Sequence, residues 1–375
     1  MRFPLTKSNY GPIGLNLGTY GARILQLERV GDGWRARAAA STTFTPASDS
    51  EGRAETLAAV IRQLYGSATF IGRKIVSCLP PCDVQVKNLR LPRMSADELK
   101  SAVKREASDR LRLDSDSYTM QFFDAGEVRQ ADEVREEVIG LAASTSVIND
   151  HLALLAEYDL EPVAIYAAPS ALARFVDCNC INDDLAPPRV VLDVGYSSSK
   201  VIICRGRRVV FFKLVDIGGR TFDEALADNL NMSRQDAAQL RRSQTNPSLT
   251  DGTGKPPVGS QRHDNIDREV YDALRPIVSE LVREVSLYLC YYSVTFRGNR
   301  PDTIALVGGE AYQPHLVELL SNNDPGKVEV IAPLQNVDVS NVERLAPTDW
   351  SLSEWALVVG LAMCQVIGAR KRGAA

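Results

Sequence analysis

The feature that most constrains this chain is a sequence pattern that occurs twice. Residues 15–25 (LNLGTYGARIL) align without a gap on residues 192–202 (LDVGYSSSKVI). Each copy reads as an apolar strand that ends in an amide or an acid, a loop with a glycine and small residues, and a second strand. Internal repetition of this kind indicates that a fold contains two related halves. The sequence therefore predicts an α/β protein with two half-domains, each built around a hairpin.

The second copy of the pattern suits a phosphate group and its magnesium ion. Asp193 ends a buried strand, and the loop after it contains Gly195, Ser197 and Ser198. Glycine lets the backbone approach a ligand, and amide and hydroxyl groups donate hydrogen bonds to phosphate oxygens. This interpretation predicts that Asp193 holds Mg²⁺ through water. The alternative is an ordinary hairpin with a solvated aspartate.

The first copy favours the phosphate interpretation, because two such loops can face one nucleotide from opposite sides. Its candidate binding residues are Asn16, Gly18, Thr19, Tyr20 and Arg23. Arg23 carries a positive charge that is able to reach phosphate. We therefore expect ATP or ADP between the two loops.

The paired loops resemble the two phosphate loops of the actin-like ATPase superfamily, which includes sugar kinases and DnaK-type chaperones. Residues 304–311 are similar to the adenosine motif of that superfamily, an apolar strand followed by Gly308 and Gly309. The resemblance implies duplicated, ribonuclease H-like half-domains around a nucleotide cleft. It also implies that Gly308 and Gly309 bind the nucleotide.

A narrower resemblance covers nearly the whole chain. Residues 91–111 (LPRMSADELKSAVKREASDRL) and residues 169–174 (PSALAR) look like parts of the PilM family, the FtsA-related actin-like proteins of type IV pilus assembly. In family terms Gly218 and Gly219 form the loop before a helix, and Arg241 stands where the family often has a lysine near the ribose. Ala238 stands where the family often has an acid, which departs from the pattern.

The PilM resemblance also implies partners. In that family a groove between an inserted domain and the first half-domain receives the tail of the inner-membrane protein PilN. Pilus assembly platform or motor ATPase proteins are further expected partners, and related type II secretion proteins share the core. The resemblance therefore implies a protein that works at the inner membrane.

A chain of 375 residues usually divides into domains. We expect the first half-domain to comprise residues 1–73, 167–189 and 346–375, and the second to comprise residues 190–345. A small inserted α/β domain is expected over residues 74–166, where Ser95 and Glu98 form the capping box of a helix. Residues 246–262 are rich in Gly, Pro, Ser and Thr and are expected to form a mobile loop.

Composition excludes some classes of protein. A net charge of −4 gives no nucleic-acid signal, which would need a basic face, and no N-terminal segment has the pattern of a signal peptide. The near-apolar residues 355–369 are too few to span a bilayer, and the tail after Ile367 has no apolar face. The seven cysteines lack zinc-type spacing, which favours a reducing compartment. We expect a cytoplasmic protein, peripheral to the inner membrane, that reaches the membrane only through partners.

Asn16 separates two classes of function. The superfamily usually has Asp at this position, and Asn lacks the negative charge that attracts a metal and cannot act as a base. Asn16 as a simple turn cap is the alternative. One candidate function is a scaffold that uses nucleotide as a structural ligand; the other is an active ATPase or small-molecule kinase. Because we place no catalytic base, we expect nucleotide binding with little or no hydrolysis.

Overall fold

The computed structural model describes residues 10–31, 33–45, 50–111, 117–130, 133–178, 188–206, 208–244, 261–296, 301, 303–313, 315–323, 326–342 and 350–364. The predicted mobile loop at 246–262 lies outside the described residues, except for its last two positions, as does the tail after Ile367. Within the described ranges, no helix has both the length and the apolar character needed to cross a membrane.

The first half of the protein is built on a six-stranded sheet with the order β14-β3-β2-β1-β4-β8. A meander of three antiparallel strands comes first along the chain, followed by two strands parallel to β1. The strands are β1 (Tyr10–Leu17), β2 (Gly21–Val30), β3 (Gly33–Thr43), β4 (Lys74–Cys78), β8 (Glu161–Tyr166) and β14 (Val337–Asp338).

The second half repeats this arrangement in a sheet with the order β11-β10-β9-β12-β13. Its strands are β9 (Arg189–Val194), β10 (Ser199–Arg205), β11 (Arg208–Val215), β12 (Thr303–Val307) and β13 (Lys327–Val330). The registers match as well: Asn16 lies opposite Arg23, and Asp193 lies opposite Lys200. The duplicated α/β fold expected from the sequence repeat is confirmed.

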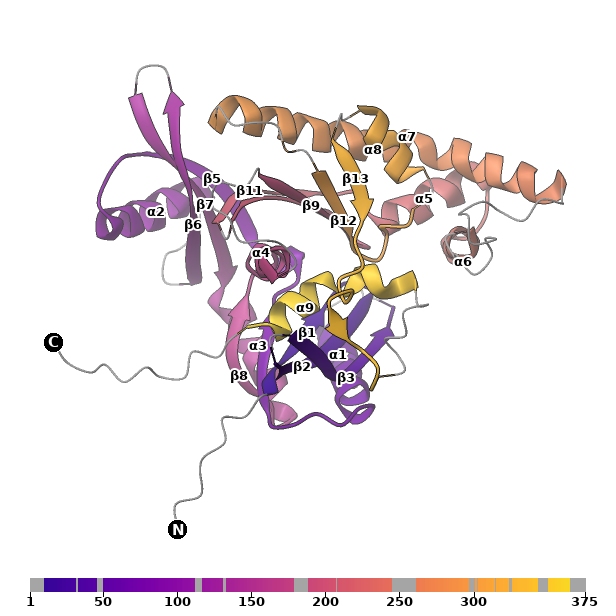
Figure 1. Ribbon diagram of the computed structural model, residues 1–375, viewed down its shortest axis with the longest axis horizontal. Coiled ribbons are helices and arrows are strands. Elements are labelled where there is room, and N and C mark those ends of the chain that lie inside the picture. Colours follow the sequence, from indigo (N-terminus) through magenta and orange to yellow (C-terminus); the bar gives the residue numbers. More distant parts are fainter. Residues whose placement is uncertain are drawn as a thin grey trace, which may run out of the picture.

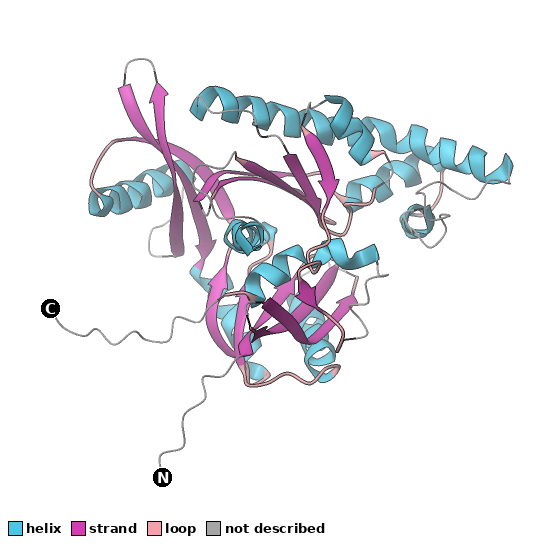
Figure 2. Cartoon of the chain, in the orientation of Figure 1, coloured by secondary structure: helices cyan, strands magenta, loops and turns pink. Residues whose placement is uncertain are grey.

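Helices cover both faces of each sheet, as Figures 1 and 2 show. Helices α4 (Ala168–Cys178) and α9 (Ala356–Ala362) lie between the two sheets, and α9 is preceded by the 3₁₀ helix η4 (Trp350–Trp355). Helices α1 (Ser50–Gly66) and α3 (Thr145–Glu157) cover the outer face of the first sheet. The outer face of the second sheet carries α5 (Gly219–Leu230), α7 (Gln261–Phe296) and α8 (Leu316–Asn323), and α6 (Arg234–Gln244) packs against α5.

Alternation along the central strands explains this layering. Leu25 and Leu27 of β2 contribute to the core shared with α4 and α9, whereas Ile24 contributes to the core beside α1. Successive side chains of a strand point to opposite faces, so a strand covered on both faces is apolar throughout. The same logic makes β9 fully buried from Val190 to Val194.

A three-stranded sheet is inserted between β4 and α3. After the short helix η1 (Pro81–Asp83) come β5 (Gln85–Pro92), α2 (Ala96–Leu111), β6 (Tyr118–Gln130) and β7 (Glu133–Ser144). Leu89, Leu99 and Val138 belong to its small core. At the start of α2, the Ser95 backbone N–H donates to the Glu98 carboxylate at 2.9 Å, which is half of the expected capping box.

The observed strands refine the expected domain limits. Strands β4 and β8 belong to the first sheet. The inserted sheet therefore takes up fewer residues than the expected range of 74–166. Strand β14 pairs with β3, so the chain rejoins the first sheet at Val337, before residue 346. The division into domains otherwise stays a prediction.

Candidate functional site

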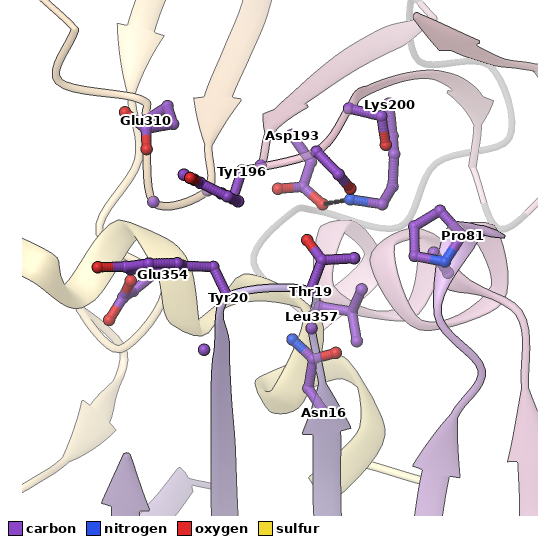
Figure 3. A pocket seen from close by; sticks show the side chains of 18 of the residues that line it. Asn16, Thr19, Tyr20, Pro81, Asp193, Tyr196, Lys200, Glu310, Glu354 and Leu357 are labelled. Atoms are coloured by element: carbon purple, nitrogen blue, oxygen red, sulfur yellow. Dashed lines mark hydrogen bonds and ion pairs between the residues drawn. The ribbon is translucent and has the colours of Figure 1, made fainter. Parts of the chain in front are cut away.

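A cavity of about 330 Å³ lies where the two halves face each other. It is lined by the loops after β1 and β9, by the turn after β12, and by η4 and α9. Most of the residues predicted from sequence line it: Asn16, Gly18, Thr19, Tyr20, Arg23, Asp193, Gly195, Ser197, Ser198, Gly308 and Gly309. The structure therefore brings three segments that are distant in sequence around one space (Figure 3).

The second loop places an ion pair at the cavity. The Lys200 Nζ lies 2.8 Å from an Asp193 carboxylate oxygen, and each residue is only 7% exposed. Figure 3 shows both side chains meeting on the upper wall. The Ser198 hydroxyl in the same loop is also buried and has no hydrogen-bond partner among the described residues. A buried hydroxyl without a partner is costly, which indicates a place for a ligand or water.

The first loop presents an amide in place of the acid. Asn16 lies near the end of β1, and in Figure 3 its side chain points toward the cavity from below. In the second loop the cross-strand partners form an ion pair with each other. In the first loop Arg23, the cross-strand partner of Asn16, forms its ion pair with Glu354 of η4. The loop is closed by the Gly18 N–H, which donates to the Gly21 carbonyl at 3.0 Å. The two repeated loops thus differ in charge although their backbones match.

Aromatic rings bridge the two loops. Tyr20 of the first loop stacks on Tyr196 of the second with ring centroids 4.5 Å apart. Arg242 of α6 lies over the Tyr20 ring and donates to its hydroxyl at 2.6 Å. Stacking and cation–π contacts of this kind hold the two halves together across the cavity.

The glycine turn after β12 completes the cavity wall. Gly308 has a φ of +102°, a backbone angle that residues other than glycine rarely adopt. The Gly308 N–H donates to the Ser353 carbonyl at 3.0 Å, and the Glu310 N–H donates to the Val194 carbonyl at 3.0 Å. The turn is therefore tied both to the end of β9 and to η4.

Three residues predicted to bind nucleotide do not line the cavity. Gly218 and Gly219 lie beside the second loop, where the Gly219 N–H donates to the Gly195 carbonyl at 3.0 Å. Arg241 is 1% exposed and lies behind the wall, between Glu310 and Asp223, at 2.8 Å from the latter. Burial raises the pKa of Asp223, and the Arg241 charge opposes that shift. The neighbouring Arg242, not Arg241, lines the cavity, and the contact of Arg241 with a nucleotide stays a prediction.

Several residues that line the cavity were not predicted from the sequence: Tyr196, Lys200, Glu310, Glu354, Arg242 and Leu357. Lys200 had a signal, because the repeat aligns it with Arg23. Glu354 had none, since only the folded chain brings η4 to the loops. Arg242 is adjacent to the predicted Arg241, and helix rotation decides which of the two faces the cavity.

The donor set does not fit a protein-held magnesium ion. Mg²⁺ in nucleotide sites is usually bound by one or two carboxylates together with phosphates and water. Asp193 is already paired with Lys200, Glu354 with Arg23, and Glu310 with Arg241. Among the described residues no group of three or more His, Cys, Asp or Glu is placed to hold a metal. The expected role of Asp193 as a magnesium ligand stays a prediction, and the ion pair with Lys200 argues against it.

Two sheets of repeated order, joined by a cavity lined by their corresponding loops, define an actin-like fold. The chain belongs to a family within that fold: residues 14–254 match the model of the type IV pilus assembly protein PilM family. The resemblance inferred from the sequence is therefore confirmed. A comparison with curated proteins finds no significant match.

Solved structures agree on the fold. A structure described as the PilM-PilN type IV pilus biogenesis complex is 22% identical, with a TM-score of 0.74, and the match covers 94% of this chain and 97% of that chain. The ethanolamine utilization protein EutJ from Carboxydothermus hydrogenoformans is 16% identical, with a TM-score of 0.51, and the match covers 96% of this chain and 91% of that chain. Both similarities extend over nearly the full length of this protein.

Proposed function

We propose that this protein is a nucleotide-binding scaffold of type IV pilus assembly, with ATP or ADP held in the cavity between its two halves. One observation carries the proposal: the two repeated loops and the Gly308–Gly309 turn meet around a single space. Backbone amides of glycine loops and hydroxyls such as that of Ser198 suit phosphate oxygens. Isothermal titration of the purified protein with ATP tests it, and the absence of heat at saturating ATP contradicts it.

The proposed partner is the cytoplasmic tail of a PilN-like inner-membrane protein. Support comes from the similar structure, which is described as a complex of PilM with PilN. The inserted sheet with α2 is large for a mere connection, since most connections are a few residues long. We propose that an extended peptide binds through main-chain hydrogen bonds and a few apolar side chains. Such binding would hold a cytoplasmic protein at the inner membrane, beside platform or motor ATPase proteins of a pilus or related secretion machine.

We expect a labelled peptide with the tail sequence of a PilN-like neighbour to bind the intact protein, as measured by fluorescence anisotropy. A scrambled peptide of the same composition is the control and should not bind. A variant in which a short linker replaces residues 84–144 should lose binding, provided that circular dichroism verifies the remaining fold. Because β4 and β8 belong to the first sheet, this deletion spares them. Equal binding of the tail and scrambled peptides would contradict the proposal that the protein binds a PilN-like tail.

The alternative function is an active ATPase or small-molecule kinase, and Asn16 distinguishes it. We expect no phosphate release above the buffer rate from the native protein with ATP and magnesium, measured by a coupled phosphate assay. The reason is that the amide of Asn16 cannot act as a base or attract a metal. Asn16→Asp should make ATP binding magnesium-dependent by adding a carboxylate to the first loop. Robust phosphate release by the native protein, lost in Asp193→Ala, would favour the enzyme instead.

A further inference from the structure

We propose that Lys200 takes the place of a divalent cation in the cavity, so that nucleotide phosphates bind there without magnesium. This inference rests on the proposed nucleotide binding and specifies its chemistry. It concerns the ammonium group of Lys200, which lies beside Asp193 in the second loop.

The ion pair is built into the sheet. Asp193 and Lys200 are direct cross-strand partners of β9 and β10, and their charged atoms are 2.8 Å apart. Cross-strand partners have their Cβ atoms close together, so the pair needs no rearrangement to form. A metal ion bound to Asp193 would have to share the carboxylate with the ammonium, and the two cations would repel each other at short range. Displacing the ammonium instead would leave it buried and unpaired, which is strongly unfavourable.

Among the described residues, the rest of the cavity offers no substitute carboxylate. Glu354 is paired with Arg23, and Glu310 is paired with Arg241 behind the wall. Asn16, opposite the second loop, is neutral. Every acid that lines the cavity therefore already has a cation, and a divalent ion gains little by entering without the phosphates.

The same cavity supplies hydrogen-bond donors for phosphate. An ammonium group carries three N–H donors, and one bond to Asp193 leaves others for a second anion. The Ser198 hydroxyl, 6% exposed and without a partner among the described residues, lies in the same loop. Charge-assisted hydrogen bonds from Lys to phosphate are stronger than neutral ones. Lys200 is therefore placed to hold a phosphate oxygen while Asp193 fixes its position.

The test is a titration of the full protein with ATP at constant ionic strength, once with magnesium and once with EDTA. We expect the native affinities in the two buffers to agree within about threefold. In Lys200→Thr the freed Asp193 repels the phosphates, so affinity in EDTA should fall about tenfold or more, and magnesium should restore it. The double variant Lys200→Thr with Asp193→Asn should show the weak binding but no restoration, because it has no carboxylate to hold the metal. Lys213→Thr, on β11, is the charge-matched control and should behave as native.

The outcomes distinguish failure of the magnesium-independent binding from failure of nucleotide binding itself. Native binding that is more than about tenfold weaker in EDTA overturns the inference while nucleotide binding stands. Unchanged affinity of either Lys200 variant in EDTA overturns it as well. If the single variant does not fold, as judged by its thermal transition, the double variant alone decides, since it leaves no buried charge unpaired. No binding of ATP by the native protein in either buffer overturns both proposals.

Discussion

Replacing Gly360 by alanine should lower the free energy of unfolding by about 3 kcal/mol, measured by urea denaturation. Gly360 lies on α9, whose residues are buried between the two sheets. A Cβ atom at this position would overlap the backbone carbonyl of Ala171 on α4. Backbone atoms cannot swing aside as a long side chain does, so the two helices must separate. The Arg174 guanidinium, which donates to the Gly360 carbonyl at 2.8 Å, would lose its geometry as well.

Gly66→Ala is the matched control for that substitution. Gly66 is the last residue of α1, and a Cβ there would meet no atom within 4 Å. Alanine at a compatible site reduces the entropy of the unfolded chain, so this variant should be neutral or slightly stabilised. Equal stability of the two variants would show that α9 and α4 do not pack as described.

Replacing Gly308 by alanine should weaken ATP binding by about tenfold or more in isothermal titration. Gly308 holds a φ of +102°, and a Cβ there would meet the Val194 carbonyl oxygen and a carboxylate oxygen of Asp193. Alanine would therefore push the glycine turn away from β9 or turn the Asp193 carboxylate aside. Either movement disturbs the cavity where the turn and the second loop meet.

Gly72→Ala separates backbone strain from this collision. Gly72 also has a positive φ, +74°, but a Cβ there would meet nothing within 4 Å. It should cost similar strain and leave ATP affinity within about twofold of native. Circular dichroism at the titration temperature verifies that both variants are folded. A folded Gly308→Ala protein with native affinity would contradict the proposed role of the turn.

The repeated hairpins could be predicted from the sequence because their signals are local. The alternation of the strands and the glycine loops are visible in residues 15–25 and 192–202, and the structure pairs them in matching registers. The ribonuclease H-like character of the two halves was implied by the family resemblance and not by periodicity. The short strand β14 carries no such local signal, since two residues gain their strand character only by pairing with β3.

The candidate site was predictable only as far as its loops. The internal repeat selected Asn16 and Asp193, and the resemblance to the adenosine motif selected Gly308; all three line the cavity. The resemblance did not distinguish Arg241 from Arg242, because neighbouring helix positions differ by about 100° around the axis. The pairs of Arg23 with Glu354 and of Arg241 with Glu310 join segments distant in sequence. Charge neutralisation in the cavity is therefore a property of the folded chain, which pattern analysis does not reveal.

The most direct test of the account is a crystal structure of the full chain grown with a non-hydrolysable ATP analogue. We expect electron density for the triphosphate between the loop of Gly18 to Tyr20 and the loop of Gly195 to Ser198. We also expect the adenosine beside Gly308 and Gly309, and a phosphate oxygen within hydrogen-bond distance of the Lys200 Nζ. An analogue bound elsewhere, or an empty cavity at saturating analogue, would contradict it.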